Sequence, residues 1–171
     1  MRILIDILIA LMLMGILAGF FMESRSQQEQ SKVHEYVHSE VQRFQQQIEI
    51  QAAMGHALSN RRSYPDTIDP EWFSLGVPQN TLLEPGHPWV EIASKDDCDL
   101  LHPRDRIVTN SSQAQFWYNP VIGVVRARVP AQVSDQDTLD LYNFINDSSL
   151  TDLFRDERKP VSLASGENTS H

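Results

Sequence analysis

A chain of 171 residues has room for one ordinary domain with a modest core, so no large catalytic cleft is expected. With 14 Lys and Arg against 23 Asp and Glu, its formal net charge of −9 leaves no basic stripe for neutralising phosphates, which excludes nucleic acid as an expected partner. The one cysteine, Cys98, cannot form an internal disulfide, so cysteine usage gives no information on the redox compartment.

The N-terminal residues 3–22 form an apolar run with a single charge, of about the 20 residues that a helix needs to cross a bilayer. They predict a transmembrane anchor over residues 1–22. The alternative is a cleaved secretory signal, which the length of the run, the lone Arg2 before it and the lack of a small-x-small site disfavour. We therefore expect a single-pass protein of the cytoplasmic (inner) membrane, with its N-terminus inside and its C-terminal domain periplasmic.

Asp6 is the one ionisable residue inside this apolar run. A charge there costs a few kcal/mol in hydrocarbon unless it is paired or close to the interface. One explanation is a pair with Arg2, which lies four residues earlier on the same helix face. The other is that Asp6 faces a neighbouring subunit.

The pattern around Asp6 resembles the N-terminal helix of type IV pilins and type II secretion pseudopilins over residues 2–21. The stretches that carry the resemblance are Leu4-Ile5-Asp6-Ile7-Leu8 and Gly15-Ile16-Leu17-Ala18-Gly19. The resemblance implies that Asp6 meets a neighbouring subunit's N-terminal amine during filament assembly. Two positions depart from the family: Arg2 replaces its aromatic first residue, and Met1 stands where the prepilin peptidase requires glycine. Either the start codon was chosen too late, or the protein is pilin-like and stays anchored. We expect the helix to stay uncut.

The next segment, residues 23–59, is predicted to be an amphipathic continuation of the same helix, ending near Leu58. Its apolar residues recur at spacings of three and four, which marks one helix face: Val33, Val37, Val41, Phe44, Ile48 and Ala52. The run is too short to sustain several coiled-coil heptads. We expect this face to pack on the protein's own domain.

Within this helix, His34-Glu35-Tyr36-Val37-His38 satisfies the H-E-x-x-H template of zinc peptidases. Such a site also needs a third ligand and a cleft. Val41 and Phe44 stand where the extended motif has glycine and histidine, and His56 lies further along the same helix. We interpret the histidines as surface residues and expect no metal, no cofactor, no catalytic residue and no enzyme activity.

Residues 60–154 predict a small α+β domain. A Pro-rich packed loop over 61–88 precedes strands at 89–93 and 106–110. Residues 115–118 and 124–129 flank a turn with Pro and Gly and predict a hairpin, with Arg126 and Arg128 on an exposed face. Four acids lie in the loop after residue 94, where a solvated turn is favoured over a calcium site: Asp96, Asp97, Asp99 and Asp105.

The C-terminal part, residues 134–154, predicts a helix capped by Ser134, and residues 155–171 predict a disordered tail. The sum is a pilin-like α+β fold, in which a long helix packs on a small antiparallel sheet with a short C-terminal helix. We expect a structural component of a type II secretion or type IV pilus-type assembly, whose partners are lipid and other pilin-like subunits or secretion machinery, with no small-molecule substrate. A non-polymerising binding module is the alternative, and a tethered zinc peptidase with His34, Glu35 and His38 is a distant third.

Overall fold

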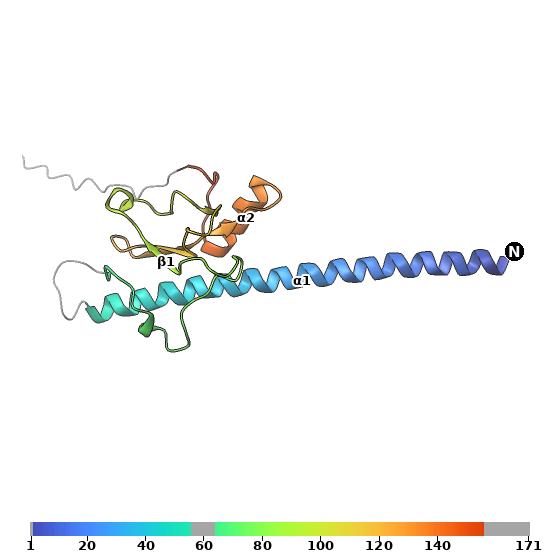
Figure 1. Ribbon diagram of the computed structural model, residues 1–171, viewed down its shortest axis with the longest axis horizontal. Helices are drawn as coiled ribbons and strands as arrows, with labels where there is room; N and C mark the ends of the chain where they lie inside the picture. Colours follow the sequence, from blue (N-terminus) through green and yellow to red (C-terminus); the bar gives the residue numbers. More distant parts are fainter. Residues whose placement is uncertain (1, 56–63, 156–171) are drawn as a thin grey trace, which may run out of the picture.

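A computed structural model of the protein describes residues 2–55 and 64–155. One long helix carries a small domain at its C-terminal half (Figure 1). In chain order the elements are α1 (Arg2–Gly55), η1 (Pro70–Trp72), β1 (Val90–Ile92), η2 (Lys95–Asp97), β2 (Ile107–Val108), β3 (Phe116–Asn119), β4 (Val124–Ala127), β5 (Val129–Pro130) and α2 (Asp135–Asn146).

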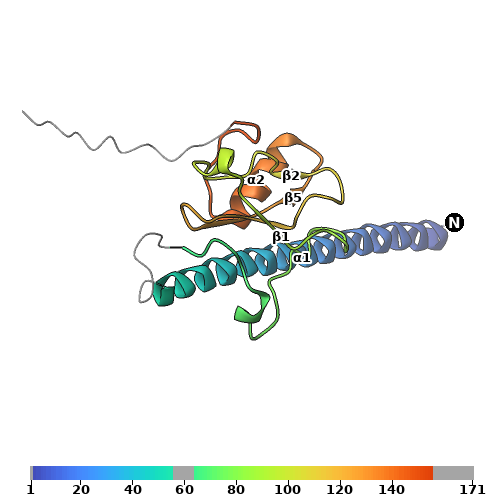
Figure 2. The same ribbon diagram turned by 60° about the vertical axis from the view of Figure 1, so that its left-hand side comes forward.

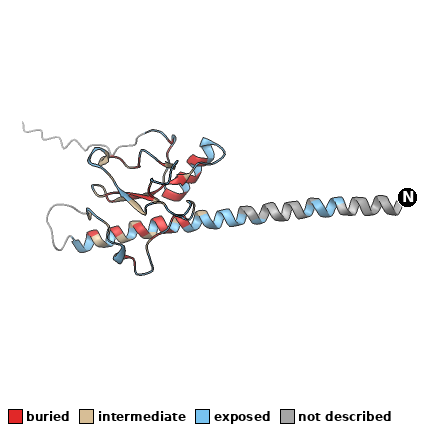
Figure 3. Cartoon of the chain, viewed as in Figure 1, coloured by how far each residue is buried: buried red, intermediate tan, exposed pale blue. Residues whose placement is uncertain are grey.

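Helix α1 is continuous from Arg2 to Gly55, so the predicted long helix is confirmed. Its domain-facing stripe is the predicted one, because the residues at spacings of three and four are buried: Val37, Val41, Phe44, Ile48 and Ala52. Figure 3 shows these buried positions, among the residues that it colours by burial, in the half of α1 that lies under the domain. The other half extends away from the domain.

The predicted transmembrane anchor over residues 1–22 is wrong, and with it the single-pass, inner-membrane assignment. Among the residues that the structure describes, no helix is both long and apolar enough to cross a membrane. Spanning needs about 20 consecutive apolar residues. The residues of α1 from Arg25 to Lys32, which precede the domain, are all polar and add nothing to such a stretch.

The predicted antiparallel, pilin-like sheet is also wrong, because the sheet is mixed. β3 lies between β1 and β4, and it pairs in parallel with β1 and antiparallel with β4. A second, two-stranded ribbon pairs β2 with β5 in parallel. The physical reason is the connection after β1, which runs through η2 and β2 and returns the chain to the same end of the sheet before β3 begins.

The predicted hairpin and the C-terminal helix are confirmed in outline. β3 and β4 pair from Phe116 with Ala127 to Asn119 with Val124. The Ser134 hydroxyl accepts a hydrogen bond from the backbone N–H of Asp137 at 3.0 Å, which is the predicted cap. The helix ends earlier than expected, at Asn146, because Asp147 takes a left-handed conformation (φ 47°) and terminates it.

The main core lies between one face of the sheet and α1. Phe44 of α1 is at its centre, with ring centroids 5.3 to 5.4 Å from those of Phe73, Trp89 and Phe116. Both ribbon views show the loop that contains η1 on the opposite side of α1 from α2 (Figures 1 and 2). The sheet, α2 and this loop therefore wrap the C-terminal half of α1.

Candidate functional site

The N-terminal half of α1 is the first candidate, because its described apolar side chains have no packing partner within the domain. Met12, Leu13, Met14 and Leu17 are 56 to 71% exposed. At 100° per residue these positions point to several sides of the helix. The side chains of Arg2 and Asp6, the predicted assembly residues, lie outside what the structure describes. Their pairing therefore stays a prediction.

The H-E-x-x-H motif lies where α1 passes α2. Glu35 is exposed, whereas His34 and His38 are half-buried rather than fully on the surface as predicted. His34 lines a groove of about 320 Å³ against α2, together with Asp137, Asp140 and Phe144, among others. Its partial burial lowers the pKa of His34.

His38 fastens α1 to the end of α2. Its Nδ1 lies 3.2 Å from the carbonyl oxygen of Ile145, and its Nε2 lies 3.0 Å from the amide nitrogen of Gln42. These contacts fit donation from Nδ1 and acceptance at Nε2. Gln42 also donates to Asp147 at 3.0 Å. Within the described ranges no three His, Cys, Asp or Glu side chains are grouped to hold a metal, and His56 lies outside them.

Gln45 of α1 bonds backbone groups on the free edge of β4, at the N-terminal end of the strand. Its side-chain amide accepts from the N–H of Val125 at 2.9 Å and donates to the carbonyl oxygen of Gly123 at 2.7 Å. Asn146 of α2 bonds the same edge at the C-terminal end of β4. It accepts from the N–H of Ala127 at 2.7 Å and donates to the carbonyl oxygen of Ala127 at 3.0 Å.

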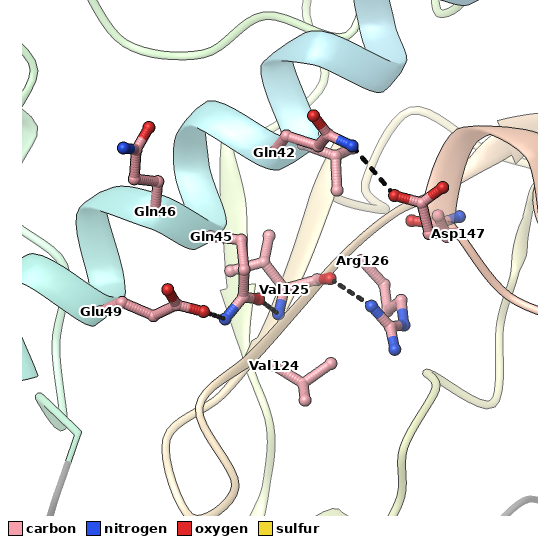
Figure 4. A pocket seen from close by; sticks show the side chains of 10 residues that line it. Gln42, Gln45, Gln46, Glu49, Val124, Val125, Arg126 and Asp147 are labelled. Atoms are coloured by element: carbon pink, nitrogen blue, oxygen red, sulfur yellow. Dashed lines mark hydrogen bonds between the residues drawn. The ribbon is translucent and has the colours of Figure 1, made fainter.

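A groove of about 390 Å³ runs along this closed edge, between α1, β4 and the end of α2 (Figure 4). Arg126 lines it and donates from Nη1 to the carbonyl oxygen of Val125 at 3.1 Å. The outward backbone groups of Val125 and Ala127 on this edge are therefore bonded to side chains. The groove is lined mainly by amides and carboxylates already engaged with one another, and it offers no evident nucleophile or acid–base pair.

Arg128 is buried, so its predicted place on an exposed face is wrong. It is 2% exposed, and its guanidinium donates to the carbonyl oxygens of Asp105 at 2.7 Å and Ala114 at 3.0 Å. A third bond, at 2.7 Å, goes to the carboxylate of Glu91. The reason is that the loop between β1 and β3 covers this second face of the sheet. Arg126 on the same face is half-buried.

Arg106 is a second buried arginine that sequence reasoning missed. Its guanidinium donates to the carbonyl oxygens of Leu153 and Arg155, which attaches the end of the described chain to the domain. Arg106 lies in a stretch where charged and apolar residues are mixed, as on a solvated strand. No signal in the sequence marks its side chain as buried. The arginines act here as clamps on backbone carbonyls, which is a structural use of the guanidinium.

His102 and Tyr142 form a buried polar pair beside these arginines. The ring Nδ1 of His102 lies 3.1 Å from the hydroxyl of Tyr142. Burial, and then the positive charges of Arg126 and Arg106, lower the pKa of His102 to about 3. Burial raises the pKa of Tyr142 above its ordinary value. Both groups are neutral at pH 7, which suits a structural contact and gives no poised general base.

The acidic loop of residues 94–105 is organised by hydrogen bonds rather than arranged around a cation. The side-chain amide of Asn119 donates to the carbonyl oxygens of Asp97, Cys98 and Leu100 at 3.0 to 3.2 Å. Asp97 accepts from Ser94 and Arg104, both at 2.7 Å. No group of three acids suited to a metal occurs among the residues with a described placement.

No protein-family model, no curated protein and no solved structure matches this chain. The resemblance of residues 2–21 to pilins and pseudopilins therefore stays a prediction.

Proposed function

We propose that the protein is a structural subunit of a type II secretion or type IV pilus-type assembly, which acts through helix–helix contact and performs no chemistry of its own. The observation that carries the proposal is the exposed apolar surface of the projecting half of α1. Apolar side chains of this size gain about 25 cal/mol for each Å² removed from water. A helix with apolar residues on several sides gains most when several other helices surround it.

The division of labour within α1 supports a subunit rather than an enzyme. The half under the domain buries one face in the core, and its Gln45 and His38 bond β4 and α2. The projecting half is left for partners. By the pilin resemblance, Asp6 would meet the N-terminal amine of the next subunit, with Arg2 as its alternative partner within the helix.

Assembly of the full-length chain is tested by adding a charge to the projecting half. Leu17→Glu and Met14→Glu place a carboxylate among the helix contacts, so sedimentation velocity should show a smaller assembly than the unmodified chain forms. Gln30→Glu is the matched control, because it adds the same charge at an exposed polar position of the same helix. An unchanged size distribution in both Glu variants would reject the proposal.

The role of Asp6 is tested separately by crosslinking. A Leu13→Cys variant in a Cys98→Ala background gives one reporter thiol on the projecting helix. Adding Asp6→Ala should reduce disulfide crosslinks between subunits while thermal unfolding of the domain stays the same. Crosslinking that survives the substitution would make Asp6 only a partner of Arg2. A chain that stays monomeric throughout would favour the non-polymerising binding module.

A further inference from the structure

The two edges of the three-stranded sheet differ in whether side chains bond their outward backbone groups. On the β4 edge, side chains of Gln45, Arg126 and Asn146 bond the outward backbone groups of Val125 and Ala127. A second strand cannot pair there without displacing them. The opposite edge is β1, Val90–Ile92.

The register of β1 shows which of its backbone groups face outward. The N–H of Phe116 donates to the carbonyl oxygen of Trp89 at 3.0 Å, and the N–H of Ala93 donates to the carbonyl oxygen of Tyr118 at 2.8 Å. In a parallel ladder, alternate residues of one strand bond to the neighbour. The bonds to β3 therefore come from the odd positions 89, 91 and 93, and Val90 and Ile92 direct their N–H and C=O groups away from the sheet.

Among the described residues, no hydrogen bond from a side chain or from another segment reaches the backbone of Val90 or Ile92. Ile92 is 38% exposed, and Val90 is half-buried against the core. A short edge whose outward backbone groups receive no bond from the described residues, unlike those of β4, is the form that accepts an added strand.

Glu91 determines the charge of the added strand. Its Oε2 accepts from Arg128 at 2.7 Å, while Oε1 has no hydrogen-bond partner in the part of the chain that the structure describes. The side chain is half exposed. A residue directly across from Glu91 would have its Cβ about 5 Å away, where an opposite charge stabilises the pair and a like charge destabilises it.

We propose that β1 is a docking edge for an extended segment of another protein, which adds as a fourth strand and places a Lys or Arg opposite Glu91. Its flanking residues are apolar and cover Ile92 and Val90. A second copy of this chain fits less well, because antiparallel pairing of two β1 strands about their centre sets Glu91 against Glu91. This inference is independent of the helix contacts proposed above.

Hydrogen exchange of the full-length chain tests whether the edge is open. The amides of Val90 and Ile92 should exchange quickly, while those of Glu91 and Ala93, bonded to β3, and of Val125, bonded to Gln45, should be protected. Slow exchange at Val90 and Ile92 in the isolated chain would overturn the proposal. Protection that grows with protein concentration would mean that the occupant is a second copy, which also overturns it.

Peptide binding tests the chemistry of the partner. The probe is a synthetic peptide of alternating Thr and Val with one central Lys, compared with the same peptide carrying Glu at the centre. The Lys peptide should bind at least about tenfold more tightly to the full-length chain. In Glu91→Gln, which can still accept from Arg128, this preference should shrink. Equal binding of both peptides to the unmodified chain would reject the pairing with Glu91.

A proline variant distinguishes pairing of the peptide with the β1 backbone from non-specific binding of the peptide. Ile92→Pro removes an N–H that faces outward and no bond to β3, so the sheet should survive while affinity for the Lys peptide falls about tenfold. Ile92→Val keeps the N–H and is the matched control. A version of the Lys peptide with alternate amides N-methylated should fail to bind either chain. Binding that persists with Ile92→Pro or with the methylated peptide would overturn the proposal.

Discussion

Gln45 on α1 and Asn146 on α2 bond the same edge of β4 from two different helices. Each side-chain amide gives this edge one donor and one acceptor, which is what a neighbouring strand would give. Gln45 spans from Gly123 to Val125, and Asn146 takes both backbone groups of Ala127. The two helices thereby fix the position of the hairpin as well as covering its apolar face.

Replacing these amides with the matching acids should lower the free energy of unfolding. Asn146→Asp keeps an acceptor for the N–H of Ala127 but loses the donors to the carbonyl oxygens of Ala127 and Tyr142. Because the site is buried, we expect a loss of about 2–4 kcal/mol in the free energy of unfolding. Gln45→Glu, at a half-buried site, should cost about 1 kcal/mol. Urea unfolding measures both, and an equal cost would contradict this account.

Substituting Arg128 should lower the free energy of unfolding much more than substituting Arg104 of the same domain. Arg128→Met leaves the buried carbonyl oxygen of Ala114 and the partly buried one of Asp105 without this donor, so we expect a loss of about 3 kcal/mol in the free energy of unfolding. Arg104→Met is the control. Arg104 donates to Asp97 at an exposed position, and its loss should cost below about 1 kcal/mol. Similar unfolding midpoints for the two variants would show that the buried clamp adds little.

The parts of the fold that follow from local periodicity could be predicted from the sequence. The spacing of Val37, Val41, Phe44 and Ile48 indicated the buried stripe of α1, and the Pro-Gly turn indicated the hairpin. The alternation of apolar residues with Arg126 and Arg128 led to the wrong prediction of an exposed face, because that interpretation requires one face of the sheet to be solvated. Here a loop from far along the chain covers that face, and such coverage leaves no local pattern.

The parallel pairing of β1 with β3 could not be predicted for a similar reason. Strand direction depends on the path of the long connection, which contains few regular elements of its own. Asn146, by contrast, carried a usable signal. It falls four residues after Tyr142 on the buried face of α2, where a polar side chain needs a specific partner.

His102 predicts a dependence of stability on pH. In the folded chain its pKa is about 3, whereas in the unfolded chain the imidazole has its ordinary pKa of 6.5. As pH falls below 6.5 the unfolded state binds a proton that the folded state does not, so stability is lost at about 1.4 kcal/mol per pH unit. Stability from this site is therefore complete above pH 6.5 and declines towards pH 3.

Comparison with His102→Gln isolates this contribution. Glutamine does not titrate, and its side-chain oxygen can still accept from the Tyr142 hydroxyl. Between pH 7 and pH 5, the free energy of unfolding of the unmodified chain should fall by about 2 kcal/mol more than that of the variant. Parallel pH profiles would mean that His102 becomes protonated without unfolding the domain.

Gly123 at the hairpin turn predicts a steric coupling to Tyr64. Its φ of 70° is in the left-handed region, and a Cβ added there would lie 2.3 Å from the Tyr64 ring. Gly123→Ala therefore meets both an unfavourable backbone conformation, of about 1 kcal/mol, and a clash that only movement of Tyr64 relieves. We expect a total loss above about 2 kcal/mol in the free energy of unfolding. In the double variant with Tyr64→Ala the clash disappears while the backbone term remains, so the two losses should sum to more than the loss in the double variant. Strictly additive losses, measured by urea unfolding of all four chains, would show that the ring moves aside at no cost.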